Sequence, residues 1–262
     1  MHDKRYAFST GALYPLESND ALTLVGQAGF GHAELMPQAF GDISDDAIQR
    51  YAKCDVHISS IHYPLALFSM LYSGHQSMAQ EGRAYSAKLV KFAHRMGTEV
   101  IVIHPTLAYE GNLKEIIEPQ VLGNIRYLYD LCEENSITLA MENYPVGVGQ
   151  YPETLEAYIT SLNMPGIQPM VDTTEVVEGG GEPADFIQKL SVAPCHLHLS
   201  DFKEGKKHLP PGLGAIAWEH VFAALKAKNY KGYYTVEPSY RYYLKDIAKK
   251  LERDFAFISS MV

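Results

Sequence analysis

The chain has 262 residues, of which 47% are hydrophobic and 20% charged, the ordinary balance of a globular protein with enough apolar material for a core. Its net charge of -9 at pH 7 argues against a non-specific hold on nucleic acid, because such binding needs a basic surface. No apolar run approaches the length of a transmembrane helix, so no membrane partner is expected.

The cysteines Cys54, Cys132 and Cys195 are odd in number, lie far apart and form no CxxC pair. This pattern predicts reduced thiols rather than a disulfide framework. The first ten residues, MHDKRYAFST, lack the apolar region of a signal peptide. We therefore expect a cytoplasmic protein.

Short runs rich in β-branched and aromatic residues alternate with longer segments of helical periodicity. Gly97 stands where a helix is expected to stop. The predicted strands are Arg5–Thr10, His32–Pro37, Ile58–Pro64, Glu99–Pro105, Thr138–Tyr144, Ile167–Thr173, Cys195–Asp201 and Tyr233–Ser239. The predicted helices include Ser77–Gly97, Leu113–Asn135, Glu153–Leu162, Pro183–Leu190, Trp218–Lys228 and Asp246–Ser259.

This alternation of strands and helices is typical of a parallel α/β architecture. At this length, the economical closure is a (β/α)8 TIM barrel in a single domain, residues 1–262. A doubly wound sheet is the alternative. It is disfavoured because the glycine-rich dinucleotide fingerprint is missing after the first strand.

Polar side chains stand at the carboxyl ends of six predicted strands, each beside an apolar residue. Ile61 precedes His62, for example, and Met141 precedes Glu142. Because side chains alternate along a strand, apolar neighbours that face the helices would turn the polar residues toward the barrel axis. The six residues are His62, His104, Glu142, Asp172, His198 and Glu237.

A single inward histidine or glutamate is more often a satisfied core residue than a ligand. Six of them at equivalent positions favour a metal site. Burying so many polar groups without compensation is costly, and a divalent cation would compensate for that cost. Active sites of TIM barrels also lie at this end. The strongest ligand candidates are mostly oxygen donors, which suit Mn²⁺ or Mg²⁺, with Zn²⁺ or Co²⁺ as alternatives. These candidates are Glu142, Asp172, His198 and Glu237.

Other inward residues are open to two interpretations. His62 and His104 either bind the metal or donate hydrogen bonds to substrate oxygens. His196 lies one pleat deeper than His198, which favours a packed interior histidine. Glu34 also points inward, and both a structural role and a role in orienting the metal ligands remain open.

The residues named above resemble those of the xylose isomerase-like barrels: sugar and sugar-phosphate isomerases and epimerases, with the type IV apurinic endonucleases as relatives. The resemblance covers nearly the whole chain. It is most specific between His198 and Trp218, where HLSD is followed by HLPPGLGAIAW. ENYP with Glu142, VDTTE with Asp172 and VEPS with Glu237 occur in the family's order.

The resemblance implies a metal-dependent isomerase or epimerase of a ketose, a sugar phosphate or a related polyol, with one divalent ion on the four ligand candidates. It also implies that Glu142 and Glu237 are catalytic, exchanging a proton at the carbon next to a carbonyl through an enediolate-like intermediate. Family members often form dimers or tetramers, so a homo-oligomer is one expectation. The implied substrate-binding residues are His62, His104, Glu175 and His208.

Two positions depart from the family's pattern. Glu175 stands where many members have a histidine, on which the three-zinc cluster of the nucleases depends. Ala217 stands where an aspartate is common, and we expect this change to affect the anchoring of the loop.

Three other functions compete with the epimerase. A dehydratase of the inosose or dehydroshikimate type would use the same metal and the same first proton abstraction, and would then expel water. An abasic-site endonuclease is disfavoured by the acidic composition and by Glu175. A binding or sensor module without turnover is disfavoured because Glu142 and Glu237 are both present.

Overall fold

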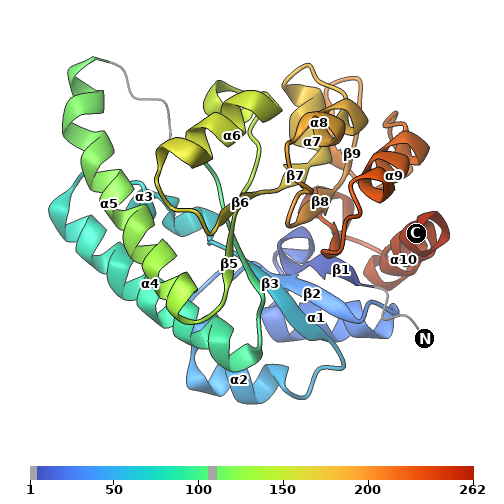
Figure 1. Cartoon of the computed structure of the whole chain (residues 1–262). Helices are drawn as coiled ribbons and strands as arrows, with labels where there is room; N and C mark the ends of the chain where they lie inside the picture. The colour runs from blue at the N-terminus through green and yellow to red at the C-terminus, as the bar shows by residue number, and fades with distance from the viewer. Residues whose placement is uncertain (1–4, 106–110) are drawn as a thin grey trace.

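The computed structural model describes residues 5–105 and 111–262, which form a barrel of parallel strands ringed by helices (Figure 1). The strands neighbour one another in the order β6-β5-β4-β3-β2-β1-β11-β8-β7. Their bounds are β1 Tyr6–Ser9, β2 His32–Leu35, β3 His57–His62, β4 Val100–Ile103, β5 Thr138–Met141, β6 Ile167–Pro169, β7 Val171–Asp172, β8 Leu197–Leu199 and β11 Tyr234–Val236.

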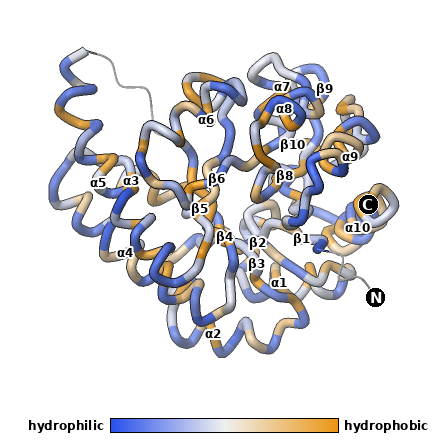
Figure 2. The backbone as a smooth tube through the Cα atoms, viewed as in Figure 1, coloured by the Kyte–Doolittle hydropathy of each residue, from blue (hydrophilic) through white to orange (hydrophobic). Residues whose placement is uncertain are grey.

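The helices present apolar residues to the strands and polar residues outward, so hydrophobic and hydrophilic colours alternate along them in Figure 2. Their bounds are α1 Ser18–Gln27, α2 Asp45–Tyr51, α3 Phe68–Leu71, α4 Gln76–Met96, α5 Asn112–Glu134, α6 Pro152–Ser161, α7 Thr173–Glu178, α8 Pro183–Lys189, α9 Trp218–Ala227 and α10 Ile247–Met261. Short 3₁₀ turns occupy η1 Thr10–Leu13, η2 Phe40–Ile43, η3 Leu65–Leu67, η4 Gly147–Gly149 and η5 Tyr240–Tyr242.

The sixth predicted strand closes the barrel. It is split into β6, which pairs with β5, and β7, which pairs with β8. Only Met170 separates the two pieces, and its N–H donates to the carbonyl of Met141 at 3.0 Å. The sheet's two ends are therefore consecutive in the chain, and the predicted (β/α)8 barrel is confirmed.

The strands are shorter than predicted, and this affects where the polar residues lie. The fourth predicted strand, Glu99–Pro105, is reduced to β4, so His104 follows the strand instead of ending it. Glu142 and Glu237 likewise come directly after β5 and β11. These three polar residues follow the last hydrogen bonds between the strands, and they therefore lie at the mouth of the barrel.

Two local predictions had different outcomes. Gly97 ends α4 with φ 72°, a left-handed conformation that glycine adopts without a Cβ clash, so the predicted helix stop is confirmed. No strand is predicted between Asp201 and Trp218, but this segment contains an antiparallel hairpin, β9 Asp201–Lys203 with β10 Lys206–Leu209.

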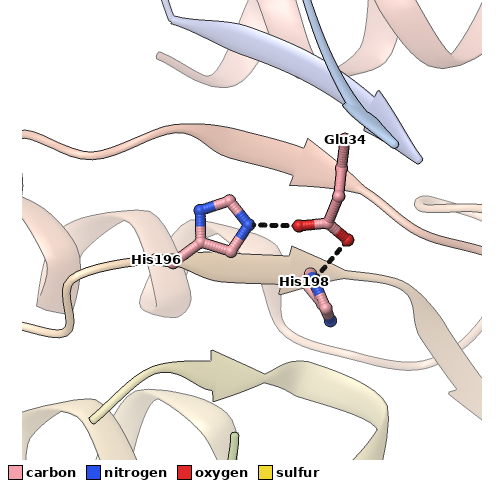
Figure 3. Close-up of side chains that lie close together, drawn as sticks. All are labelled: Glu34, His196 and His198. Atoms are coloured by element: carbon pink, nitrogen blue, oxygen red, sulfur yellow. Dashed lines mark hydrogen bonds and ion pairs between the residues drawn. The ribbon is translucent and has the colours of Figure 1, made fainter. Parts of the chain in front are cut away.

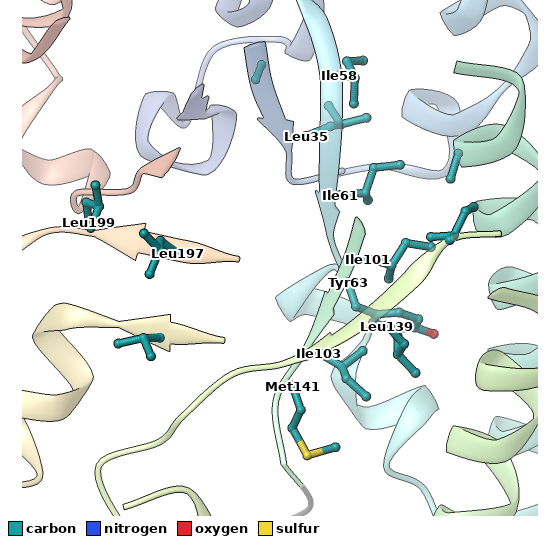
Figure 4. Packing of buried hydrophobic residues seen from close by; sticks show 14 of the residues in the cluster. Leu35, Ile58, Ile61, Tyr63, Ile101, Ile103, Leu139, Met141, Leu197 and Leu199 are labelled. Atoms are coloured by element: carbon teal, nitrogen blue, oxygen red, sulfur yellow. The ribbon is translucent and has the colours of Figure 1, made fainter. Parts of the chain in front are cut away.

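The apolar residues beside the polar strand ends face the helices, as the alternation predicts. Ile61, Ile103, Met141, Leu197 and Leu199 are all fully buried and belong to the large core between strands and helices (Figure 4). Inside the barrel, a separate small cluster is formed by Val100, Val102, Ala140 and Met170.

Candidate metal centre

A pocket of about 370 Å³ opens at the carboxyl ends of the strands. The loop after β5 contributes Asn143 to its wall, and η5 contributes Tyr240. His198 lies beneath it, fully buried on β8. The other predicted site residues all line the pocket: His62, His104, Glu142, Asp172, Glu175, His208 and Glu237.

Three carboxylates converge on one nitrogen of His198. Its Nδ1 lies 2.7 Å from Glu142 Oε1 and 2.7 Å from Glu237 Oε2, with Asp172 Oδ2 at 4.0 Å. Ligand atoms from all four residues lie within 4.8 Å of one another and could hold a metal ion. A ring nitrogen carries one proton or one lone pair, so it cannot satisfy three carboxylates by itself. The donor set fits a cation placed among these atoms.

Glu34 occupies the opposite side of the same imidazole (Figure 3). Its Oε1 lies 2.9 Å from His198 Nε2, a close ion-pair contact that is bent away from ideal hydrogen-bond geometry. Its Oε2 lies 2.9 Å from His196 Nε2, and all three side chains are fully buried. A carboxylate beside Nε2 favours the proton on that nitrogen, which leaves the lone pair of Nδ1 directed at the pocket.

The three residues Glu34, His196 and His198 also form a group that could hold an ion. Thr235 Oγ1 contacts His196 Nε2 at 3.3 Å, so this ring nitrogen has two polar neighbours below the pocket, Thr235 and Glu34. Glu34 thus contacts both histidines, and His196 is fully buried, as the sequence predicts for an interior histidine.

The pKa values of His198 and Glu142, which face each other, are shifted in opposite directions. Burial alone would lower the pKa of His198, but the carboxylates of Glu237 and Glu34 raise it well above its ordinary value. Burial would raise the pKa of Glu142, but His198 and His104 hold it well below the usual range. The single imidazole of His198 thus interacts with several carboxylates at once.

Asp172 shows the cost of burying a carboxylate most directly. Burial raises its pKa to about 8, and the nearby His208 only partly opposes this shift. A divalent cation would favour the ionised carboxylate and remove the conflict. The electrostatics of the pocket therefore agree with the geometry.

Glu142 also faces a second group. Its Oε2 lies 2.8 Å from His104 Nε2 and 3.5 Å from His62 Nε2, and these three residues could hold an ion too. His62 Nδ1 contacts the carbonyl of Tyr63 at 2.8 Å, which favours a proton on Nδ1 and a lone pair on Nε2. Glu142 therefore joins the two groups through its two oxygens.

Glu175 and His208 pair at the rim of the pocket. His208 Nε2 lies 3.0 Å from Glu175 Oε1. Burial would lower the pKa of His208, but Glu175 and Asp172 raise it to about 9. The hairpin brings His208, at the end of β10, back over Asp172, with Oδ2 3.8 Å from its Nδ1.

Sequence reasoning missed two polar residues of the site. Asn143 donates to the backbone carbonyl of Asp172 and accepts from its N–H at 2.6 Å, fixing that residue's backbone. Ser9 donates to Glu237 Oε1 at 3.0 Å. Each follows or ends a strand in the manner of the predicted residues, so strand-end position was the available signal.

The loop before α9 is anchored without an aspartate at position 217. Asp201 accepts from the N–H groups of Gly212 and Ile216 at 3.0 Å and from Trp218 Nε1 at 2.9 Å. Gly214 permits this approach, because a Cβ there would lie 2.1 Å from Asp201 Oδ1. Asp201 therefore anchors the loop before α9, which lies in the stretch where the resemblance to the family is most specific.

Positive charge is scarce around the pocket. Among the residues that the structure describes, no lysine or arginine lines it. Lys203, Lys206 and Arg241, which follow strand ends in the sequence, are all exposed. The described lining thus contains histidines but no lysine or arginine that would bind a phosphate.

The fold and the pocket define a (β/α)8 barrel with a candidate metal centre at its mouth. The chain belongs to the family described as xylose isomerase-like TIM barrel, whose model matches residues 22–261. Within residues 5–105 and 111–262, none of the helices combines the length and the apolar character that a membrane crossing requires.

Individual relatives are distant. An uncharacterized protein of Mycobacterium bovis is 23% identical over 260 residues, covering 90% of this chain and 89% of that protein. The D-psicose 3-epimerase of Enterocloster bolteae is 28% identical over 131 residues, 49% of this chain and 42% of that protein. The solved D-psicose 3-epimerase with D-tagatose from Clostridium cellulolyticum H10 has a TM-score of 0.77 at 15% identity, covering 98% of each chain.

Proposed function

We propose that this protein is a divalent-metal-dependent epimerase or isomerase of a keto sugar. The observation that carries the proposal is the contact of Glu142 and Glu237 with one ring nitrogen of His198, each at 2.7 Å, with Asp172 beside them. Epimerases of D-psicose and of L-ribulose 5-phosphate among its relatives support the substrate class.

The metal would be held by Glu142, Asp172, His198 and Glu237. Three carboxylates and one imidazole suit Mn²⁺ or Mg²⁺ better than a thiolate-seeking ion, with Zn²⁺ or Co²⁺ as alternatives. Bound there, such an ion supplies Lewis acidity that stabilises negative charge on a carbonyl oxygen and acidifies the adjacent C–H.

Glu142 and Glu237 are the proposed acid and base. They approach His198 Nδ1 from β5 and β11, which are separated in the barrel by β6/β7 and β8 on one side. Ser9 holds Glu237, and His104 and His198 hold Glu142, so both carboxylates are positioned before substrate arrives. One carboxylate would accept the proton from carbon and the other would return one.

The remaining polar residues of the pocket would bind hydroxyl groups. His62 and His104 stand on the side of Glu142, and the pair Glu175 and His208 stands beside Asp172. Because the described lining has no lysine or arginine, the pocket favours an unphosphorylated sugar over a sugar phosphate.

Deuterium exchange tests the assignment. The purified protein would be analysed for metal and then incubated with D-fructose, D-psicose, D-tagatose and an inosose in D₂O. The wild-type protein is expected to place deuterium on the carbon next to the carbonyl, whereas Glu142→Gln and Glu237→Gln abolish this exchange. Glu219→Gln, an exposed position on α9, is the matched control and retains it.

Two outcomes would change the proposal. Exchange at the wild-type rate in both active-site variants would show that neither glutamate is the base. A product lighter by one water would make the protein a dehydratase that shares the first proton abstraction.

A further inference from the structure

A second and larger cavity, here called the side chamber, adjoins the metal pocket. Its volume is about 1260 Å³, and the two cavities share His104 and Tyr144 in their linings. The side chamber lies between α3, the first half of α5, and α6 with the loop that precedes it. In Figure 1, α3 and α5 lie at the left of the view and α6 lies above β6.

The lining of the side chamber is largely apolar. It includes Phe68 of α3, Ile117 and Leu122 of α5, and Tyr158 of α6, together with Met78 and Val148. Such a surface suits an apolar or aromatic group, since removing it from water is favourable.

Charge in the side chamber is balanced. Among the described residues that line it, Lys114 is the only lysine or arginine and Glu118 is the only acidic residue. Their charged groups lie 4.0 Å apart, and the Lys114 side chain is 61% exposed. A paired lysine at the solvent edge gives a phosphate or carboxylate no dedicated partner, so the lining favours a neutral ligand.

The wall toward the barrel is built by specific hydrogen bonds. Asn124 is buried and donates to the carbonyls of Leu71 and Ser73, which holds the end of α3. Tyr72 donates to the carbonyl of His104 at 2.5 Å. Since protein interiors leave few voids larger than a water molecule, a cavity with so defined a wall is a candidate for a ligand.

We propose that the side chamber receives an aromatic or similarly sized apolar group carried by the keto sugar at its end remote from the carbonyl. This inference rests on the proposed function. The carboxylates and the metal would take the carbonyl end, because the candidate ligands lie at that side of the shared wall. The remote end then lies against His104 and Tyr144, which line both cavities and whose rings contact each other with centroids 5.7 Å apart.

Two ethers of D-fructose test the proposal, because they leave the reacting end unchanged: 6-O-benzyl-D-fructose and 6-O-methyl-D-fructose. Their dissociation constants for the Mn²⁺-loaded protein would be measured by isothermal titration calorimetry. The benzyl ether is expected to bind at least about tenfold more tightly, which corresponds to about 1.4 kcal/mol.

A matched pair of variants locates the effect. Ile117→Glu places a charge in the lining and is expected to bring the two ethers within about twofold of each other. Ile116→Glu changes the preceding residue, which is 73% exposed and outside the lining, and keeps the tenfold preference. Val148→Trp fills the side chamber from the loop after β5 without adding charge. It is expected to remove the preference for the benzyl ether as Ile117→Glu does.

Equal dissociation constants in the wild-type protein, or no measurable binding of either ether, would overturn the proposal. A benzyl preference that survives both Ile117→Glu and Val148→Trp would do so as well, because the group would then bind elsewhere. Deuterium exchange with unsubstituted ketoses is a separate measurement. A benzyl preference without any exchange would leave the chamber in place and refute the epimerase.

Discussion

Two layers of the barrel interior differ sharply although the same strands build them. The part of the middle layer built by β4 to β7 is apolar, and Val100, Val102, Ala140 and Met170 pack together there, whereas the part beside β8 is polar, with His196 against Glu34. One pleat further toward the carboxyl ends, the layer contains His104, Glu142 and Asp172 with their histidine and carboxylate neighbours. The apolar part of the middle layer is complete by packing alone, whereas the upper layer holds buried charged groups, which we propose to be the ligands of a metal ion.

This difference explains why the two layers tolerate change differently. A cavity in the middle layer is expected to lower the stability of the fold and leave the chemistry intact. A change in the upper layer is expected to remove the chemistry, since its residues are the proposed ligands of one shared ion. The predictions below compare the two layers, in order of decreasing expected effect.

His198 on β8 and His196, which directly precedes β8, give the largest contrast. His198→Gln removes the ring nitrogen at which the carboxylates converge, so affinity for Mn²⁺ should fall more than about 100-fold, beyond the loss from removing a group that only orients a ligand. His196→Gln, one pleat deeper, should change affinity less than tenfold. Titration with Mn²⁺ measures both, and equal losses would contradict the division into layers.

The middle layer is tested by Met170→Ala. Its side chain is fully buried, so the substitution should lower the free energy of unfolding by about 2–5 kcal/mol. Urea unfolding gives this value. Mn²⁺ affinity should remain that of the wild-type protein, and a parallel loss of affinity would show that the layers are coupled.

Removal of the metal should destabilise the protein. At a free Mn²⁺ concentration of 100 times Kd, binding stabilises the folded state by about 2.7 kcal/mol, which is roughly 5–10 °C in Tm. Thermal unfolding with chelator and with Mn²⁺ measures the shift. The shift should vanish in His198→Gln and persist in Met170→Ala, and its absence from the wild-type protein would argue against the metal centre.

Glu34→Gln should weaken Mn²⁺ binding less than His198→Gln does. The amide keeps the size of the side chain but loses the charge beside His198 Nε2, so Mn²⁺ affinity should fall about 10–100-fold. The Tm of the chelator-treated protein serves as the control for folding. Unchanged affinity would assign Glu34 a purely structural role.

The sequence predicted the barrel and the strand-end residues because both follow from local periodicity. Alternation placed Ile61 and Met141 outward and Glu142 inward, and the structure has this arrangement. Strand lengths were overestimated, since β propensity does not show where ladder hydrogen bonds end. The hairpin that carries His208 was missed because its short, charged strands have no hydrophobic alternation.

Helices were predicted unevenly for the same reason. The long α4 and α5 show clear periodicity, whereas the six-residue α7 follows Asp172 directly and was absorbed into the predicted sixth strand and the loop after it. Asp172 caps α7 by accepting from the N–H of Glu175 at 3.0 Å. One aspartate thus serves a helix terminus and the candidate metal centre, which spacing alone does not reveal.

By itself, the sequence determined the order of strands and helices, the inward direction of the polar strand ends and the membership of a barrel family, because these depend on neighbours in the chain. Only the tertiary structure decided that Glu142, Asp172 and Glu237 meet at one nitrogen of His198, and that Glu34 faces the other. Such contacts join residues up to 164 positions apart, from Glu34 to His198, and they exist only because closure of the barrel brings all the strand ends to one mouth.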